Sequence, residues 1–436
     1  MKGLFSISVV ALFMVVMTGC SSLPGDDSSA LNVEDELGLV SISILPFEGQ
    51  VNINQSDDIA TVISADLRRS GQFRALSQEQ MLARPASIDD VNYKQWNALG
   101  LEYLVIGSVQ SLDTDGYEVR FRLLDTHRER QIIGLGIKTK SSNLRVIAHR
   151  ISDQIYKNIL GVSGSFATRI AYIHSNQQVD GKRVNELIIA DADGHNPHTI
   201  VRSTEPLMSP AWSPDGSKIA YVSLEKGQSA IFVQELYTGK RQEVARFKGI
   251  NSAPAWSPNG DKLALTLSKT GNPDIYVYHM TTQKLEAITR HTAVDTEPAW
   301  SPDGRSLVFT SDRGGEAQIY RVAASGGEAQ RVTFNNSYNA SACYSPDGKR
   351  LALVTRDGEN DRIAVMDLAS GKMQVLSNGN LDESPSFAPN GSMIIYTSKT
   401  GRRAILAGVS VDGRVHHRFS PREGEVREPV WSPYIN

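Results

Sequence analysis

Cysteine is nearly absent from this chain of 436 residues, which contains only Cys20 and Cys343. If Cys20 carries a modification, no intrachain disulfide is possible. The fold must then rest on a hydrophobic core, which a chain of this length can supply. Cys343 lies in a run that we expect to be a strand, 340–344, where a small buried side chain is a more ordinary role than a reactive thiol.

A strong excess of charge of either sign is also missing. Lys and Arg number 45 and Asp and Glu number 48, which gives a formal net charge of −3. Proteins that bind nucleic acid normally carry a basic footprint, so this balance argues against nucleic acid as the main partner. With 40% hydrophobic and 21% charged residues, the composition is that of a globular protein with room for two or more domains.

The apolar run at the N-terminus is too short to favour a spanning helix. It extends from Leu4 to Met17, after a single charge at Lys2, and the segment ends at Cys20. Residues 1–20 therefore read as a secretory signal. The ending Met-Thr-Gly-Cys resembles the bacterial lipoprotein box, which implies lipidation of Cys20; ordinary cleavage near Gly19 without lipid is the alternative. Residues 21–31, rich in Ser, Asp and Gly, are then a polar tether.

One stretch recurs through the second part of the chain. Its fullest form is Asp295–Thr310, in which a Trp-Ser-Pro-Asp-Gly box precedes a β-branched and aromatic run. The proline of this box occurs at Pro214, Pro258, Pro302, Pro346, Pro389 and Pro433, so that successive copies are 44, 44, 44, 43 and 44 residues apart. A period of this length with strand-like content is the sequence signature of a β-propeller.

Each copy predicts four short strands. Proline sets φ at the first central position of a tight turn, Asp or Asn accepts local hydrogen bonds, and Gly takes positive φ. In the copy around Pro302, this turn joins an innermost strand, 297–300, to a second strand, 307–310. Runs at 319–322 and 328–333 supply the third and fourth strands. One copy is therefore one blade.

The two ends of the repeat are offset by one strand. Residues 168–173 match a second strand although no turn box precedes them, and the missing innermost strand is 428–433, near the C-terminus. We therefore expect a six-bladed β-propeller over residues 165–436 that the C-terminal strand closes. Closure removes the exposed edges that an open stack of blades would leave.

Residues 32–164 follow a different pattern. Alternating apolar residues predict strands at 40–47, 73–76, 103–109, 117–124 and 132–139, and helical spacing predicts helices at 57–70, 89–99 and 143–160. This order predicts an N-terminal α/β domain with helices on a mixed sheet. The fold class is multidomain, with this domain followed by the propeller.

Several segments carry a resemblance to a known family. They are Pro206–Val222, Leu381–Gly391 and Trp431–Tyr434 in the propeller, and Ile44–Phe47, Ala65–Gly71, Trp96–Gly100 and Phe166–Tyr172 before it. Together with the two-domain order, they resemble the TolB family, the periplasmic propellers of the Tol–Pal envelope system. The resemblance covers the chain from about Asn32 to its end. The turn box alone is shared by many propellers.

The resemblance implies a non-enzymatic periplasmic scaffold without a cofactor. Members bind the peptidoglycan-associated lipoprotein Pal on one propeller face, engage TolA through the N-terminal region, and help keep the outer membrane attached during cell division. Other outer-membrane proteins are further candidate partners. Here a lipoprotein-like box and a tether stand where the family has a free, strand-forming N-terminus, and 31–37 is the candidate for that segment. Acylation of Cys20 would anchor the protein to the outer membrane.

The loops that enter the six innermost strands are the candidate partner-binding site. Propeller geometry brings all six to the mouth of the central channel, and in TolB-like proteins the matching loops receive Pal. The candidate residues are Met208, Ala253, Thr296, Glu297, Asp382 and Glu383. In a purely structural interpretation, Asp and Thr cap turns and Pro starts strands. Calcium at this mouth also stays open, and the alternative function is a propeller that binds a glycan or a small polar ligand there.

Other motifs have ordinary interpretations. The acidic turns 113–116 and 191–194 lack the later ligands of a calcium loop. His195 and His198 are three apart, a spacing that suits a helix face, but His195 follows a glycine in a turn between strands, so that exposed loop histidines are a more ordinary interpretation than a metal pair. The segment 161–165 misses the final glycine of the nucleophile elbow and follows a helix. We also expect no hydrolase domain beyond the closing strand.

Overall fold

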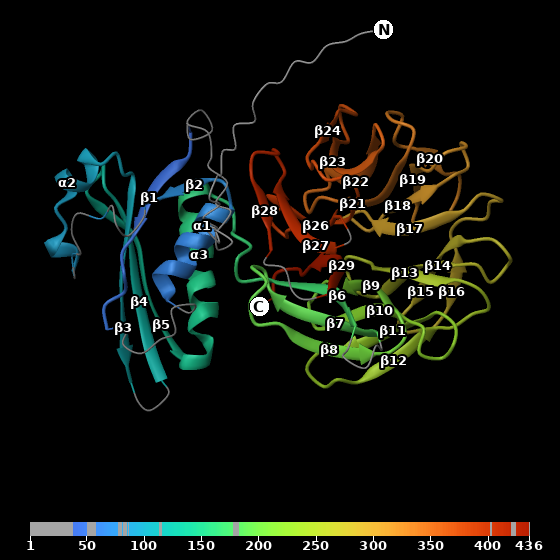
Figure 1. The fold of residues 1–436 in the computed structure, drawn as a ribbon, viewed down its shortest axis with the longest axis horizontal. Helices are drawn as coiled ribbons and strands as arrows, with labels where there is room; N and C mark the ends of the chain where they lie inside the picture. The colour runs from blue at the N-terminus through green and yellow to red at the C-terminus, as the bar shows by residue number, and fades with distance from the viewer. Residues whose placement is uncertain are drawn as a thin grey trace, which may run out of the picture. The chain divides into compact units, whose positions relative to one another are not determined.

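The computed structural model describes residues 38–49, 58–76, 81, 85, 87–112, 116–177, 183–401, 403–419 and 424–435 (Figure 1). The signal-like segment, Cys20, the tether and the segment 31–37 lie outside the described residues, as does most of the acidic turn 113–116. By its contacts, the chain from Leu39 to Asn436 forms one compact unit. No helix in the described part combines the length and apolar character needed to cross a membrane.

The N-terminal domain is built on a five-stranded mixed sheet with the order β2-β1-β3-β4-β5. Its strands are β1 (Val40–Ile44), β2 (Phe73–Ala75), β3 (Tyr103–Ser111), β4 (Gly116–Asp125) and β5 (Arg130–Lys140). Strand β1 pairs in parallel with β2 and β3, whereas β3, β4 and β5 form an antiparallel meander. The predicted α/β domain is confirmed.

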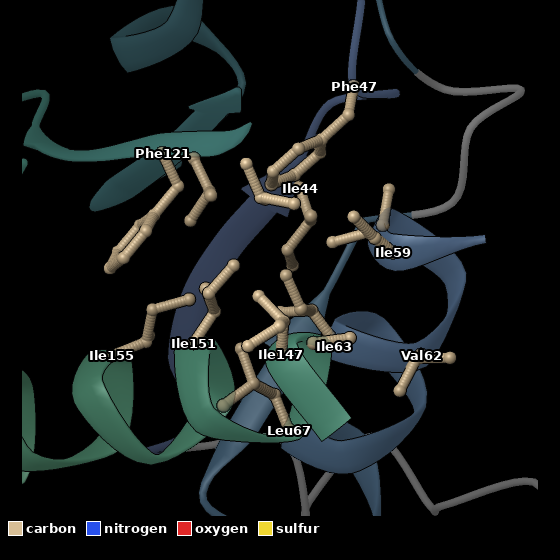
Figure 2. Close-up of a cluster of buried hydrophobic side chains, with 14 of the residues drawn as sticks. Ile44, Phe47, Ile59, Val62, Ile63, Leu67, Phe121, Ile147, Ile151 and Ile155 are labelled. Carbon is tan, nitrogen blue, oxygen red and sulfur yellow. The ribbon is translucent and has the colours of Figure 1, made fainter. Parts of the chain in front are cut away.

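One face of this sheet is covered by α1 (Ile59–Arg69) and α3 (Leu144–Leu160). Helix α1 starts where the Asp58 carboxylate accepts a hydrogen bond from the Thr61 backbone N–H at 2.8 Å, which satisfies one of the free donors of the first turn. Helix α3 ends at Gly161, whose φ of +78° suits glycine. Figure 2 shows Ile63 of α1 and Ile151 of α3 among the side chains of the core between helices and sheet.

The second face is covered over part of its area only. The predicted helix 89–99 is divided into a 3₁₀ turn, η3 (Ile88–Asp90), and a short helix, α2 (Tyr93–Ala98), because Val91 between them is extended. Trp96 of α2 packs in a second buried cluster with Leu104 and Leu124 of the sheet. A further 3₁₀ turn, η4 (Ser141–Asn143), leads into α3.

The second domain consists of six four-stranded antiparallel sheets. From the innermost strand outward, the first blade is β29 (Glu425–Trp431), β6 (Arg169–Gln177), β7 (Arg183–Asp191) and β8 (His198–Ser203), and the second is β9 (Leu207–Trp212), β10 (Lys218–Ser223), β11 (Ala230–Glu235) and β12 (Arg241–Ala245). The third blade is β13 (Asn251–Trp256), β14 (Lys262–Leu267), β15 (Asp274–His279) and β16 (Leu285–Ala287), and the fourth is β17 (Asp295–Trp300), β18 (Ser306–Ser311), β19 (Gln318–Ala323) and β20 (Gln330–Arg331). The fifth blade is β21 (Asn339–Tyr344), β22 (Arg350–Asp357), β23 (Asn360–Asp367) and β24 (Met373–Val375), and the sixth is β25 (Asp382–Phe387), β26 (Met393–Thr400), β27 (Arg403–Ser410) and β28 (His416–Arg418). The six-bladed propeller predicted from the repeat is confirmed.

The last strand closes the ring, as the offset of the repeat predicts. Strand β29 pairs antiparallel with β6, with Val430 opposite Ala171 and Trp431 opposite Ile170. The backbone N–H of Ser432 donates to the carbonyl of Arg169 at 2.8 Å and extends the pairing. In Figure 1 the red β29 lies beside the green β6, although these strands come from opposite ends of the propeller sequence.

Candidate functional site

The turn box builds the base of each blade. In the box at 212–216, the Ser213 hydroxyl donates to Asp215 at 2.5 Å and accepts from the Lys218 backbone N–H at 2.9 Å. Burial opposes ionisation of Asp215, but hydrogen bonds from Ser213 and Ser217 outweigh it and lower the pKa of Asp215 to about 2. The same serine–carboxylate pair recurs at Ser301 and Ser345, so the box is scaffold.

The tryptophan of the box ties neighbouring blades together. The indole N–H of Trp256 donates to the Ala211 carbonyl at 3.2 Å, and that of Trp300 donates to the Ala255 carbonyl at 3.0 Å. Trp212 reaches Val430 in the same way at 3.2 Å. Each bond joins one innermost strand to that of the preceding blade. The repeated indoles therefore hold the channel wall in place.

A ring of strained residues surrounds the channel. One residue in each innermost strand has a positive φ between 47° and 58°, although none is glycine. The six residues are Ser209, Ala253, Glu297, Ser341, Ser384 and Glu428, and all six line the same cavity of about 470 Å³. We call them the channel ring. In five of the six blades the next residue is proline.

The channel ring coincides with a bulge in each innermost strand. Opposite β18, for example, pairing passes from Thr296 with Thr310 directly to Ala299 with Val308, so two residues of β17 face one of β18. Equivalent shifts occur in the other five blades. Left-handed backbone at residues other than glycine costs of order 1–3 kcal/mol and gathers at functional sites. Six such positions around one opening make the channel ring a candidate site.

Two glutamates link the channel ring from blade to blade. The Glu297 carboxylate accepts hydrogen bonds from the Ser341 backbone N–H at 2.9 Å, the Ser341 hydroxyl at 2.7 Å and the Thr310 hydroxyl at 2.8 Å. Glu428 accepts from the Ser209 backbone N–H across the closure of the ring. Burial raises the pKa of Glu428, and its hydrogen bond to Ser209 acts against this rise. Both side chains thus hold the next ring residue in position.

Only some of the residues predicted from the sequence as the partner-binding site lie in the channel ring. Ala253 and Glu297 belong to the channel ring, but Glu297 is already occupied by hydrogen bonds. Met208 and Thr296 are half-buried residues adjacent to the ring, and Glu383 lies 3.5 Å from the Lys399 ammonium. Asp382 differs from the expectation, because it is fully buried and accepts from the Gly379 backbone N–H at 3.1 Å. It is the first residue of β25 rather than part of an exposed loop.

Sequence reasoning did not find Ser209, Ser341, Ser384 and Glu428 of the channel ring. Their residue types carry no sign of positive φ. The position before a proline, in five of the six copies of the repeat, was the available signal; it points to every ring residue except Ser341, which precedes Ala342.

Sequence reasoning also missed an ionic cluster that joins the α/β domain to the propeller. His149 and Arg145 of α3 both reach Asp193 in the turn after β7; the His149–Asp193 distance is 3.6 Å. His149 also contacts Asp66 of α1 at 2.7 Å, and Arg69 pairs with Asp66 at 2.6 Å. Asp66, His149 and Arg145 are at most 7% exposed. The turn 191–194, predicted to be an ordinary one, is therefore an attachment point between domains.

This ionic cluster has the residue types of a metal site but not the charge balance of one. The ligand atoms of Asp66, His149 and Asp193 lie within 4.8 Å of one another. Each carboxylate already faces a guanidinium, from Arg69 or Arg145. Burial lowers the pKa of His149, but Asp66 and Asp193 outweigh this effect and raise it overall. The group is a set of buried ion pairs between the two carboxylates and the side chains of Arg69, Arg145 and His149.

The segment 161–165 joins the two domains and shows no nucleophile geometry. The Asp153 carboxylate accepts from the backbone N–H groups of Phe166 at 2.8 Å and Ala167 at 3.2 Å, and a side chain at Gly164 would collide with it. Ser165 is buried, and its carbonyl accepts from the Thr168 hydroxyl at 2.5 Å.

Cys343 of the propeller also has a structural role, because its thiol donates to the Pro385 carbonyl at 3.3 Å, and burial raises the pKa of this thiol to about 12.

Comparison with known proteins matches both domains. The profile of the TolB amino-terminal domain matches residues 34–132, and that of the TolB beta propeller domain matches residues 156–435. The chain is 60% identical over 392 residues to the Tol-Pal system protein TolB of Nitrosococcus oceani, covering 90% of each chain. It is 61% identical over 398 residues to that of Methylobacillus flagellatus, covering 91% of each.

A solved structure agrees with these relatives. The crystal structure of TolB from Acinetobacter baumannii matches with a TM-score of 0.84 at 39% identity, over 91% of this chain and 97% of that chain. The two matched domains, their order and the closed six-bladed ring are thus accounted for together. The chain belongs to the TolB family of Tol-Pal system proteins.

Proposed function

We propose that this chain is a non-enzymatic periplasmic scaffold that binds a Pal-like peptidoglycan-associated lipoprotein at the channel mouth. The observation that carries this proposal is the channel ring, in which all six blades present a residue of positive φ to one opening of about 470 Å³. Membership of the Tol-Pal system supports a partner from within that system.

The wall of this opening is suited to binding because it is held rigid beforehand. Proline follows five of the ring residues, indole bonds tie adjacent blades, and Glu297 and Glu428 fix their neighbours. A preorganised surface loses little conformational entropy on association. A partner segment that enters the opening meets small side chains of the ring, such as Ala253 and Ser384, and turn-box residues such as Trp212 and Pro258.

The proposal extends to TolA and to the envelope. In it, the N-terminal region engages TolA, and the joint attachment to Pal and TolA maintains outer-membrane integrity and supports constriction during division. It requires no cofactor. Calcium at the channel mouth stays a prediction, and Glu297 supports it poorly because its carboxylate oxygens already accept three hydrogen bonds.

Binding of the purified lipoprotein, measured by titration calorimetry, tests the proposal. Ala253→Arg fills the mouth from a position whose side chain ends at Cβ, and it should weaken binding at least about tenfold. Gln242→Arg adds the same charge on β12, the outermost strand of its blade, and should bind as the unmodified protein does. If the two variants bind the lipoprotein with equal affinity, the channel mouth is not the binding site.

Palmitate labelling tests the predicted anchor. The full chain should incorporate labelled palmitate, and the Cys20→Ala variant should not. If both forms are labelled equally, or neither is labelled, the protein is not anchored through Cys20, and the scaffold proposal at the channel mouth stands unaffected.

A further inference from the structure

The α/β domain carries a long strand with one unpaired edge. Within the described residues, β5 pairs only with β4, and it ends the sheet order β2-β1-β3-β4-β5. It has 11 residues, and Leu135 at its centre is 41% exposed. Proteins usually shorten, bend or cover such an edge, because its free N–H and C=O groups are a template for another strand. Here the edge is long and accessible.

Next to this edge the open face of the sheet is hollowed. A cavity of about 520 Å³ lies over β3, β4 and β5, on the part of the second face that α2 leaves uncovered. Its floor includes Gly134 and Gly136, which pair with Arg122 and Arg120 respectively. The two glycines of β5 therefore leave space between the arginines of β4 and the free edge.

The arginine side chains occupy part of this space. A Cβ placed on Gly136 would lie 3.5 Å from Cγ and 3.9 Å from Nε of Arg120, and one placed on Gly134 would lie 3.3 Å from Cγ of Arg122. Arg120 pairs with Glu118 at 2.8 Å but remains 63% exposed. Among the described residues, Arg122 makes no ion pair, so its charge is available to a ligand.

The charge of the edge indicates what would bind there. Strand β5 contains Arg130, Lys138 and Lys140 and no acidic residue. A second copy of the same strand would bring like charges together, which opposes pairing of two copies. An incoming strand would place every second side chain over the glycines, within reach of Arg120 and Arg122, since side chains alternate between faces with a period of two.

We propose that β5 and the adjacent cavity form a docking site for an extended segment of a partner protein with acidic residues at alternate positions. The partner's backbone adds a sixth strand at β5, and its carboxylates pair with Arg120 and Arg122 across the two glycines. This mode combines main-chain hydrogen bonds for affinity with charge pairs for specificity. The site is separate from the channel ring.

Two labelled peptides of equal composition test the site on the full chain by fluorescence anisotropy. The first, Thr-Glu-Val-Glu-Thr-Glu-Val, alternates its acidic residues; the second, Glu-Glu-Glu-Thr-Val-Thr-Val, clusters them. The alternating peptide should bind at least about fivefold more tightly, since only it presents all carboxylates on one face. Equal binding of the two would show attraction to net charge alone and would overturn the proposal.

Matched variants locate the binding. Arg122→Gln should weaken binding of the alternating peptide roughly fivefold. Arg150 is an exposed arginine of α3, and Arg150→Gln should leave the affinity for the peptide unchanged. Gly136→Val fills the cavity without changing charge, and the nearest atom to its Cβ is the movable Glu118 carboxylate at 3.3 Å, so the strand should still fold. If the Gly136→Val variant binds the alternating peptide with unchanged affinity, or if the two arginine variants lose affinity equally, the site is not at β5.

Discussion

At the scale of single residues, the indole N–H groups of the turn boxes connect neighbouring blades by hydrogen bonds. Trp256→Phe removes the hydrogen bond to the Ala211 carbonyl and should lower the free energy of unfolding by about 1 kcal/mol. The ring should still close, because Phe387 fills the equivalent place in another blade. Urea denaturation measures the change. Tyr237→Phe, at an aromatic side chain that is 82% exposed, is the control and should have no effect.

The buried carboxylate of Asp153 makes stability depend on pH. Burial raises the pKa of Asp153 to about 6, although the backbone N–H groups of Phe166 and Ala167 lower it in part. An unfolded aspartate titrates near 3.9, so the folded chain binds more protons between about pH 4 and 6. The stability contributed by this group is therefore highest below that window and falls as pH rises through it.

Asp153→Asn should remove this part of the pH dependence. Between pH 4.5 and 7, the unmodified protein should lose on the order of 1–2 kcal/mol more of its unfolding free energy than the variant does. Denaturant unfolding at both pH values gives the comparison. If the two proteins change equally over that interval, Asp153 is not the titrating group.

At the scale of elements, the ionic cluster fastens α3 to the propeller. The folded pKa of His149 is raised, so its contribution to stability is complete below the unfolded value near 6.5 and is lost as pH rises through the folded value. His149→Gln should destabilise the protein by roughly 1–3 kcal/mol at pH 6 and by less at pH 9. Thermal unfolding at both pH values tests this, and equal destabilisation would contradict a charged imidazole.

The closing strand β29 should decide whether the propeller folds. Deletion of Glu425–Asn436 leaves β6 without its inner partner and exposes an edge, so the product should aggregate or unfold. Deletion of Tyr434–Asn436 alone retains β29 and should give a soluble protein. Size-exclusion chromatography and circular dichroism compare them. A monomeric, cooperatively melting product of the longer deletion would show that closure is dispensable.

Sequence periodicity predicted these elements because it records local chemistry. The Pro-Asp-Gly turns set the blades, and the displaced repeat at Glu428–Pro433 indicated how the ring closes. Burial of individual side chains depends on distant partners and was not predictable. Asp382 was expected at the surface and is buried, and Asp193 was expected in a free turn and meets Arg145 and His149.

Only two of the six residues of the channel ring were predicted from the sequence, for a related reason. Glycine is the residue type that indicates a positive φ in a sequence, and none of the six ring residues is glycine. The strain at Ser341 or Ser384 is imposed by the bulge and by packing between blades, which are properties of the assembled propeller. Ala253 and Glu297 were found because the strand entrances were considered as a group, without a sign of their backbone conformation.

At the scale of the whole molecule, the blades join into one rigid ring around the opening. The indole hydrogen bonds and the two glutamates act between blades, and the closing strand β29 completes the blade that the two ends of the propeller share. A surface assembled in this way is suited to a partner that contacts several blades at once. The central claim is therefore that a Pal-like lipoprotein occupies the channel mouth.

Photo-crosslinking in living cells tests this claim most directly. A photoreactive phenylalanine replaces Ser384, in the channel ring, or Gln242, on the outermost strand of the β9 blade. After irradiation, the account predicts a covalent adduct with the peptidoglycan-associated lipoprotein at Ser384 and none at Gln242. No adduct at Ser384, or equal yields at the two positions, would contradict it.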